Sequence, residues 1–150
     1  KLKEEDFNIS KMLEKIYKKH NGLAEDKKIE IIPNIQDSYN YKGDERLLEK
    51  AISNIVGNAI TYSPSKEKVF ITFKDNIINI ENTGIHIEEE NLKQLFDPFF
   101  RIDKSRSRNT GGSGLGLYIA KTVFDYHKIQ YKIENTKRGV LFTIILPSNR

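Results

Sequence analysis

Two asparagines on one predicted helix could hold a metal ion. Asn54 and Asn58 are four residues apart in the run NIVGNAITY, so a helix places both on one face, at the margin of its apolar stripe. Asparagine is a poor helix former, and its amide needs hydrogen-bond partners at the edge of a core. Amide oxygens suit Mg²⁺, which binds few protein oxygens together with phosphates and water. The alternative is that both amides are structural and bond a neighbouring loop.

A glycine-rich stretch, NTGGSGLGLYIA at residues 109–120, runs directly into a predicted amphipathic helix. The first N–H groups of a helix lack intrahelical partners and carry the positive end of its dipole, so phosphates bind well there. The alternative is a flexible linker, but a linker would not lead straight into a strong helix. The stretch is neither a Walker loop nor a Rossmann fingerprint, because the lysine-containing order is absent and no strand leads directly into it.

Two further loops could complete a phosphate and base site. Four cations stand just upstream of the glycines and could close over phosphates, although a solvated basic loop is the alternative: Arg101, Lys104, Arg106 and Arg108. The loop ENTGIHI combines Asn82 and Gly84 with the apolar Ile85 and Ile87, a mixture that suits a base pocket and also suits any turn. His86 lies between the two isoleucines, and we expect a surface residue there rather than a ligand.

Three main helices and two hairpins are predicted to position these groups. The first helix begins in FNISKMLEKIY with Ser10 as a candidate cap, the second runs from Asp44 to Tyr62, and the third carries its apolar face on Leu115, Ile119, Val123 and Tyr126. A short helix is expected in EEENLKQLF, before Pro98. Strands are predicted at KIEIIPNI, SYNYKG, VFITFKDNIINIE, QYKIEN and VLFTIILP, and the last three segments form two hairpins.

The order of these elements predicts the fold class. Helices alternate with hairpins, so we expect an α/β two-layer sandwich in which about three helices cover one face of a mixed, largely antiparallel sheet. Pro33 lacks a donor and limits the strand KIEIIPNI to an edge or an end.

The composition describes one globular domain. At 150 residues the chain can bury roughly two thirds of its unfolded surface. Cysteine is absent, which excludes disulfides and thiolate metal sites. The net charge of +4 could indicate an anionic partner, but 25 basic residues against 21 acidic ones is a modest excess. We therefore expect a solvated basic surface and no nucleic-acid partner.

Five segments in this order resemble the catalytic ATP-binding domain of bacterial sensor histidine kinases, in the wider family that includes gyrase and Hsp90-type ATPases. NIVGNAITYSP resembles the N box, NTGIHI the first glycine box, LFDPFFRID the F box, GGSGLGLYIAK the second glycine box and RGVLFTIILP the closing strand pair. Each box is loose alone, but five in order with family-like spacing are highly specific. The basic loop with ENTGIHI is similar to sensors of the vancomycin-resistance kind.

The resemblance implies that ATP binds between the second predicted helix and a lid that spans the F box to the second glycine box. It implies that Asn58 coordinates Mg²⁺ and that Asn54 is a catalytic residue in contact with phosphate or metal. Tyr62 and Ile87 would pack on adenine, and Asn82 would bind the adenine amino group. These roles agree with the chemistry that the residue types allow.

The resemblance also implies a role for the lid. Arg101 would approach the γ-phosphate during transfer and is the second expected catalytic residue. The other residues expected in the ATP site come from the two glycine boxes and the F box: Gly84, Phe100, Gly112, Ser113, Gly114, Leu115, Gly116 and Leu117.

Three positions depart from the family pattern. Asn82 replaces an aspartate, so the adenine contact loses its charge, and His86 replaces a glycine, so the loop could turn differently. Lys50 stands four residues before Asn54, where many relatives carry Glu, Gln or His. Glu49 is next to it but lies about 100° around the helix. A charged lysine cannot accept a proton from water, so hydrolysis of the gyrase kind is disfavoured, whereas transfer to histidine is mostly positioning and charge neutralisation.

The resemblance finally sets expectations for the surrounding protein. The three histidines lack the setting of a phosphoacceptor, so we expect the acceptor on a separate dimerisation domain, with residues 1–6 as the tail of that domain or a linker and residues 7–150 as the catalytic domain. The other expected partner is a response regulator. We expect this chain to be a monomeric, cytoplasmic piece of a membrane-anchored homodimer, since it begins with Lys1 and carries no signal segment.

Overall fold

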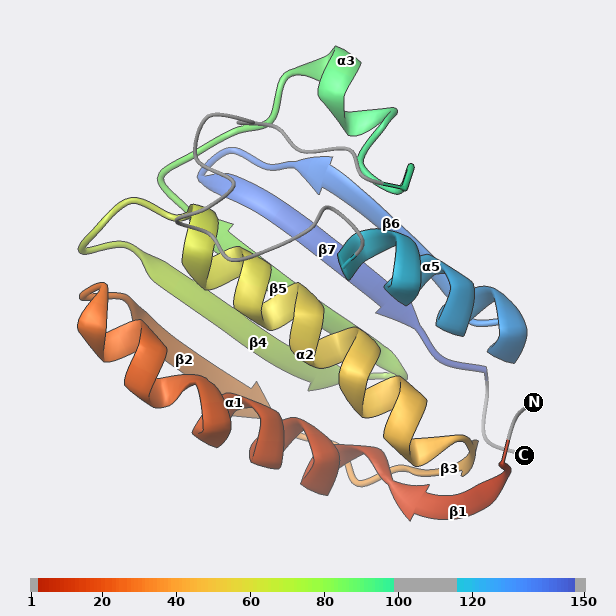
Figure 1. Cartoon of the computed structure of the whole chain (residues 1–150). Coiled ribbons are helices and arrows are strands. Elements are labelled where there is room, and N and C mark those ends of the chain that lie inside the picture. Colours follow the sequence, from red (N-terminus) through yellow and green to blue (C-terminus); the bar gives the residue numbers. More distant parts are fainter. Residues whose placement is uncertain (1–2, 99–115, 148–150) are drawn as a thin grey trace.

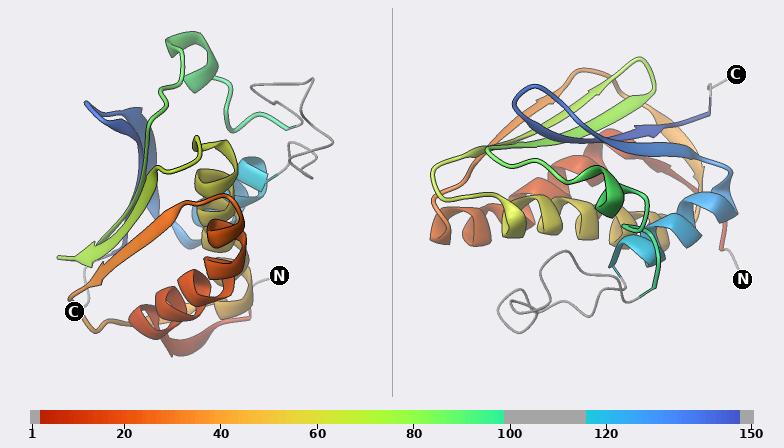
Figure 2. Two further views of the ribbon diagram at one scale, coloured as in Figure 1. Left: turned by 90° about the vertical axis from the view of Figure 1, so that its left-hand side faces the viewer. Right: turned by 90° about the horizontal axis from the view of Figure 1, so that it is seen from above.

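The computed structural model describes residues 3–98 and 116–147, and it forms two layers. A five-stranded sheet has the order β2-β4-β5-β7-β6, and α1, α2 and α5 cover one of its faces (Figures 1 and 2). The bounds are β1 Glu5–Asn8, α1 Ile9–Asp26, β2 Glu30–Ile35, β3 Asn40–Gly43, α2 Glu45–Tyr62, β4 Lys68–Lys74, β5 Ile77–Thr83, α3 Glu89–Leu92, α5 Gly116–His127, β6 Gln130–Asn135 and β7 Gly139–Ile145.

The sheet is mixed and mostly antiparallel, which confirms the predicted fold class. Strand β2 runs parallel to β4, whereas β4–β5, β5–β7 and β6–β7 are antiparallel pairs. Pro33 lies in the middle of β2, which pairs only with β4 in the described sheet, so the expected edge position is confirmed. The predicted strand SYNYKG forms β3, but β3 pairs with β1 in a separate two-stranded sheet.

Both predicted hairpins are present. Asp75 and Asn76, with φ of 54° and 66°, form a two-residue turn between β4 and β5. Residues with positive φ at both central positions match the right-handed twist of the flanking strands. The second hairpin joins β6 to β7 through residues 136–138.

Helix α2 begins and ends where its sequence predicts. The Asp44 side chain accepts a hydrogen bond from the Leu47 N–H (3.1 Å), and Ser63 follows the last turn in an extended conformation. The helix buries an apolar stripe against the sheet: Leu48, Ala51, Ile52, Ile55, Val56, Ala59 and Ile60. This burial fixes the rotation of the helix and therefore the direction of its two asparagines.

Helix α5 lies beside α2 (Figure 1), and a histidine joins their ends. Nδ1 of His127 donates to the Val123 carbonyl (2.7 Å), and Nε2 accepts from the Asp44 N–H (3.0 Å). Since Asp44 also caps α2, one junction fixes the start of α2 and the end of α5. None of the helices in residues 3–98 and 116–147 is long and apolar enough to cross a membrane.

Two local predictions were wrong, and a third element is present but shorter than predicted. Asn8 rather than Ser10 caps α1, because β1 pairing carries the chain to Asn8 before the helix begins, and its Oδ1 accepts from the Lys11 N–H (2.9 Å). Ser10 instead donates to the Asp37 carbonyl. Tyr126 is 65% exposed, and Phe124 is buried in its place. The short helix spans only Glu89–Leu92.

Part of the N-terminal segment 1–6, predicted to be the tail of a preceding domain or a linker, lies in a strand of this domain. Glu5 and Asp6 pair with Gly43 and Lys42 in the β1–β3 sheet. The division of the chain after residue 6 stays a prediction.

Candidate nucleotide-binding site

The two asparagines of α2 face the beginning of α5. Asn54 and Asn58 are half-buried, and neither side chain makes a hydrogen bond within the described part of the chain. A Cβ placed on Gly116 would lie 3.8 Å from Nδ2 of Asn58 and 3.9 Å from Cβ of Asn54. The N box therefore lies beside Gly116 of the second glycine box, and the described residues leave both amides available to a ligand.

Asn82 is a buried amide without a hydrogen-bond partner in the described part of the chain. It lies near the end of β5, with 7% of its surface exposed, on the same face of the sheet as the buried Ile78 and Ile80. That is the face that the helices cover (Figure 2). Within residues 3–98 and 116–147 its side chain makes no hydrogen bond. Buried side-chain amides are nearly always hydrogen-bonded, so this one is suited to a ligand or an ordered water.

Close backbone packing lies behind Asn82. Gly139 of β7 pairs with Thr83, and a Cβ at Gly139 would lie 1.8 Å from the Asn82 carbonyl oxygen. Only glycine permits this approach of the two strands. The end of β5 is thereby fixed against β7.

The loop after β5 is attached to the β6–β7 turn. The Gly84 N–H donates to the Arg138 carbonyl (3.0 Å), and Nε2 of His86 donates to the Thr136 carbonyl (2.8 Å). Asn135 bonds both backbone groups of Ile87: its Oδ1 accepts from the N–H (2.9 Å) and its Nδ2 donates to the carbonyl (2.7 Å). The loop that was expected to border adenine is therefore held at three residues, Gly84, His86 and Ile87.

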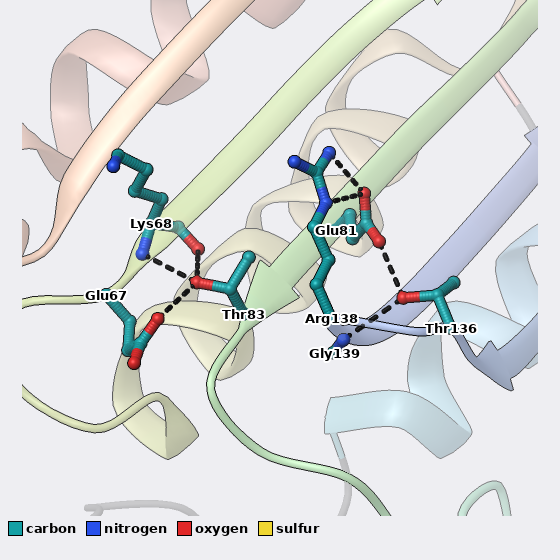
Figure 3. Close-up of polar contacts among 7 residues, drawn as sticks. All are labelled: Glu67, Lys68, Glu81, Thr83, Thr136, Arg138 and Gly139. Atoms are coloured by element: carbon teal, nitrogen blue, oxygen red, sulfur yellow. Dashed lines mark hydrogen bonds and ion pairs between the residues drawn. The ribbon is translucent and has the colours of Figure 1, made fainter.

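The turn is held in its own right, as Figure 3 shows. Glu81 of β5 accepts hydrogen bonds from the Thr136 hydroxyl (2.6 Å) and from Nε and Nη2 of Arg138 (3.2 and 2.8 Å). The Arg138 guanidinium also lies 4.0 Å from the centre of the Phe70 ring. Burial alone would raise the pKa of Glu81, but the hydrogen bonds from Arg138 and Thr136 and the charge of Arg138 together outweigh burial, so the pKa lies below its ordinary value.

A second anchor fixes the other side of the loop. The Thr83 hydroxyl donates to Oε1 of Glu67 (2.7 Å) and accepts from the Lys68 N–H (3.0 Å), as Figure 3 shows. Gly84 has a φ of 87°, and a Cβ there would overlap the Glu67 side chain at 2.4 Å. The loop therefore needs glycine at its first position.

The remaining described site residues lie around this core. Tyr62 is half-buried at the end of α2, Ile87 and Leu117 are half-buried, and Gly84 is exposed. Six residues expected in the site lie outside the described residues: Phe100, Arg101, Gly112, Ser113, Gly114 and Leu115.

Lys50 and Glu49 differ in what they contact. Oε1 of Glu49 forms an ion pair with Nζ of Lys15 on α1 (3.3 Å), whereas Lys50 is exposed and makes no ion pair with the described residues. Both line a groove of about 620 Å³ between α1 and α2, and Asn54 lies at the edge of the same groove. Within residues 3–98 and 116–147, Lys50 is therefore an unpaired charge one turn from Asn54, whereas the neighbouring carboxylate of Glu49 is paired.

The donor set suits a metal that also binds phosphate. Among the described residues there is no group of three or more His, Asp or Glu side chains that could hold a metal ion. Asn54 and Asn58 offer amide oxygens alone, which is compatible with Mg²⁺ only if phosphate oxygens and water supply the other ligands. The residues present fit a nucleotide–magnesium complex better than a resident metal.

Sequence reasoning missed the residues that hold the loop. No role was assigned to Glu81, Asn135, Thr136 or Arg138, because each acts across a separation of about 50 residues. The only available signal was the prediction that the two hairpins share a sheet.

Among the described residues, this two-layer fold carries three side-chain amides without hydrogen-bond partners, Asn54 and Asn58 on α2 and Asn82 on β5, and such groups are suited to bind a polar ligand. Residues 43–150 match the family described as histidine kinase-, DNA gyrase B-, and HSP90-like ATPase, and the chain belongs to this family. The sensor protein VanSB of Enterococcus faecalis is 35% identical over 147 residues, which cover 95% of this chain and 33% of that protein. The chain thus spans about a third of the length of this relative.

Solved structures share the fold. The mycobacterial sensor histidine kinase MprB superposes with a TM-score of 0.82 at 22% identity, covering 97% of both chains. The histidine kinase ThkA, solved in complex with the response regulator protein TrrA, gives a TM-score of 0.77 at 23% identity and covers 99% of this chain and 42% of that one.

Proposed function

We propose that this chain binds Mg-ATP and donates the γ-phosphoryl group to a histidine on a separate dimerisation domain of its parent protein. The observation that carries the proposal is the set of three amides without hydrogen-bond partners among the described residues, Asn54, Asn58 and the buried Asn82. Membership of an ATPase family and the 35% identity to a sensor protein support the same activity.

The proposed roles follow from position. Asn82 accepts a hydrogen bond from the adenine amino group, and Ile87 and Tyr62 border the base. The N–H groups at the start of α5, from Gly116 and the preceding glycine box, bind phosphate oxygens. Asn58 would hold Mg²⁺, which neutralises charge on the phosphates, and Asn54 lies one turn away to orient them. Arg101 and Phe100 complete the site from the F box.

Transfer requires little covalent chemistry from this domain. The acceptor imidazole nitrogen attacks the γ-phosphorus, the bond to the β,γ-bridging oxygen breaks, and ADP leaves with that oxygen. Lys50 cannot act as a base toward water while it is charged, so the site favours transfer over hydrolysis. The groove beside Lys50 leaves this end of α2 open to an approaching acceptor.

The proposed partners lie outside the described chain. They are the phosphoacceptor domain, a second copy of the parent protein and a response regulator. The ThkA complex supports the last of these by analogy of fold. We further propose a membrane-anchored parent with this domain in the cytoplasm.

A binding experiment tests the nucleotide site. Titrate a fluorescent ATP analogue into the wild-type chain, Asn58→Ala and the control Asn21→Ala, which removes an exposed helical asparagine of α1, with and without Mg²⁺. We expect magnesium to tighten binding to the wild type and the control but not to Asn58→Ala. Equal, metal-independent binding by all three would refute the proposed site.

A second candidate function is a nucleotide-binding module without catalysis. Two observations favour it: Asn82 lacks the charge of the usual aspartate, and Lys50 replaces the usual polar acceptor. Phosphohistidine formation on a separately supplied acceptor domain would exclude this alternative.

A further inference from the structure

The β6–β7 turn and the end of β6 make hydrogen bonds to the loop 84–87 to which the proposed function assigns no role. They contact the loop through a backbone carbonyl at Arg138, a backbone carbonyl at Thr136 and a side-chain amide at Asn135. Among these described contacts, only Asn135, the last residue of β6, bonds the loop through its side chain. It bonds Ile87, the residue proposed to pack on the base.

Resting on the proposed function, we propose that Asn135 is a positioning residue that holds Ile87 against the base and thereby sets the preference of the site for adenine. Asn135 uses both halves of its amide on one residue of the loop, at 2.9 and 2.7 Å. Paired donor and acceptor contacts of this kind fix orientation as well as distance, as they do in a strand ladder.

The anchor of Asn135 is rigid before any ligand binds. Thr136, the next residue, donates its hydroxyl to Glu81, which is only 14% exposed, and accepts from the Gly139 N–H (3.1 Å). Arg138 bonds the same carboxylate and covers Phe70. The turn is therefore tied to β5 and β4, and Asn135 transmits that rigidity to Ile87.

The two base-contacting residues depend on the turn in different ways. Asn82 is fixed by the sheet and by the close approach of Gly139, so it keeps its place when Asn135 is removed. Ile87 lies four residues after the end of β5 and has no sheet pairing of its own. Loss of Asn135 should therefore release the apolar contact of Ile87 with the base, while the amide of Asn82 stays in place.

His86 gives the loop segment that carries Ile87 a second, weaker attachment to the turn. Its Nε2 donates to the Thr136 carbonyl at 2.8 Å, and its ring is exposed. Where the family pattern has a flexible glycine, His86 therefore adds a side-chain hydrogen bond to the turn. Removing it should loosen Ile87 in the same direction as removing Asn135, by a smaller amount.

The experiment compares ligands that share phosphates but differ in base. Measure by calorimetry the dissociation constants of ATP, GTP and inorganic tripolyphosphate, each with Mg²⁺, for the wild type, Asn135→Ala, Asn135→Asp and His86→Ala. The matched control is Asn79→Ala, which removes an asparagine from the opposite face of β5. Circular dichroism and thermal melts establish that each variant is folded.

We expect Asn135→Ala to weaken ATP about tenfold, the equivalent of one to two net hydrogen bonds, and tripolyphosphate less than twofold. GTP should weaken less than ATP, so that the preference for adenine falls. Asn135→Asp keeps the acceptor for the Ile87 N–H and should lose less than alanine, and His86→Ala should lose less still while remaining folded.

Two results would overturn the inference: unchanged ATP affinity in folded Asn135→Ala, or equal weakening of all three ligands, which would indicate general loosening of the domain. If Asn135→Ala does not fold, His86→Ala decides by the same comparison. Failure of the wild-type chain to bind ATP at all would refute the proposed function instead, so the two failures are distinguishable.

Discussion

Replacing Asn82 with leucine should make the ligand-free protein more stable and abolish its stabilisation by ATP. Asn82 is only 7% exposed, and its side chain has no hydrogen-bond partner among the described residues. An unsatisfied buried polar group costs about 1–3 kcal/mol, and leucine has nearly the same shape as asparagine. We therefore expect Asn82→Leu to raise the free energy of unfolding by about 1–2 kcal/mol.

With ATP bound, the wild type should be the more stable of the two proteins. A ligand at one hundred times its dissociation constant stabilises the folded state by about 2.7 kcal/mol. The wild type with saturating Mg-ATP should gain this amount, whereas Asn82→Leu, which cannot bind the adenine amino group, should gain much less. In a domain of this size 1 kcal/mol corresponds to about 2–4 °C in the melting temperature, which differential scanning fluorimetry resolves.

The assay is a set of thermal melts with and without Mg-ATP for the wild type, Asn82→Leu and the control Asn79→Leu. Asn79 lies on the same strand but on the opposite face of the sheet, so its substitution should leave the ATP shift intact. The reasoning is refuted if Asn82→Leu lowers the ligand-free stability by more than about 1 kcal/mol, because the amide would then have a partner in the free protein. It is equally refuted if Asn82→Leu keeps the full ATP shift.

Three further predictions follow from the contacts around the site. Gly139→Ala should cost at least about 3 kcal/mol in urea denaturation, because its Cβ would lie 1.8 Å from the Asn82 carbonyl; a loss below 1 kcal/mol would show that the strands can separate. The bonds from Arg138 lower the pKa of Glu81, so their contribution of about 1 kcal/mol should be complete above the ordinary pKa of 4.5 and disappear as the pH falls through the lowered value; a pH-independent difference between the wild type and Glu81→Gln would contradict this. Lys50→Glu should raise ATP hydrolysis without acceptor about tenfold or more by phosphate release, and an unchanged rate would remove the charge of Lys50 from the explanation.

Local chemistry made much of the fold predictable. Asp44, Ser63 and the apolar stripe between them define α2 in sequence, and the structure follows them because a cap, a stop and a buried face agree. The hairpin at Asp75 and Asn76 was predictable for the same reason. Where two local solutions compete, the sequence was ambiguous: Ser10 and Asn8 are both good caps, and pairing of β1 with β3 decided for Asn8.

The residue types of the site were predictable from the sequence, but the contacts that hold its loop in place were not. Asn54 and Asn58 lie on one helical face by periodicity alone, and the structure places Gly116 beside them. By contrast, nothing local indicates that Asn135 meets Ile87, since that contact depends on the order of strands in the sheet and on the shape of two turns. Tyr126 was misassigned because a single apolar residue fits the stripe in sequence, whereas Phe124 occupies the space against Tyr131 and Phe142.

The central claim is transfer of phosphate from this domain to a histidine, and a reconstituted transfer assay tests it most directly. Mix the chain with the separately produced phosphoacceptor domain of its parent protein and ATP labelled at the γ-position, with and without Mg²⁺. The account predicts an acid-labile, base-stable phosphohistidine on the acceptor domain, dependent on magnesium, lost in Asn58→Ala and retained in Asn21→Ala. ATP binding without any label on the acceptor domain, under conditions where both domains are folded, would contradict it.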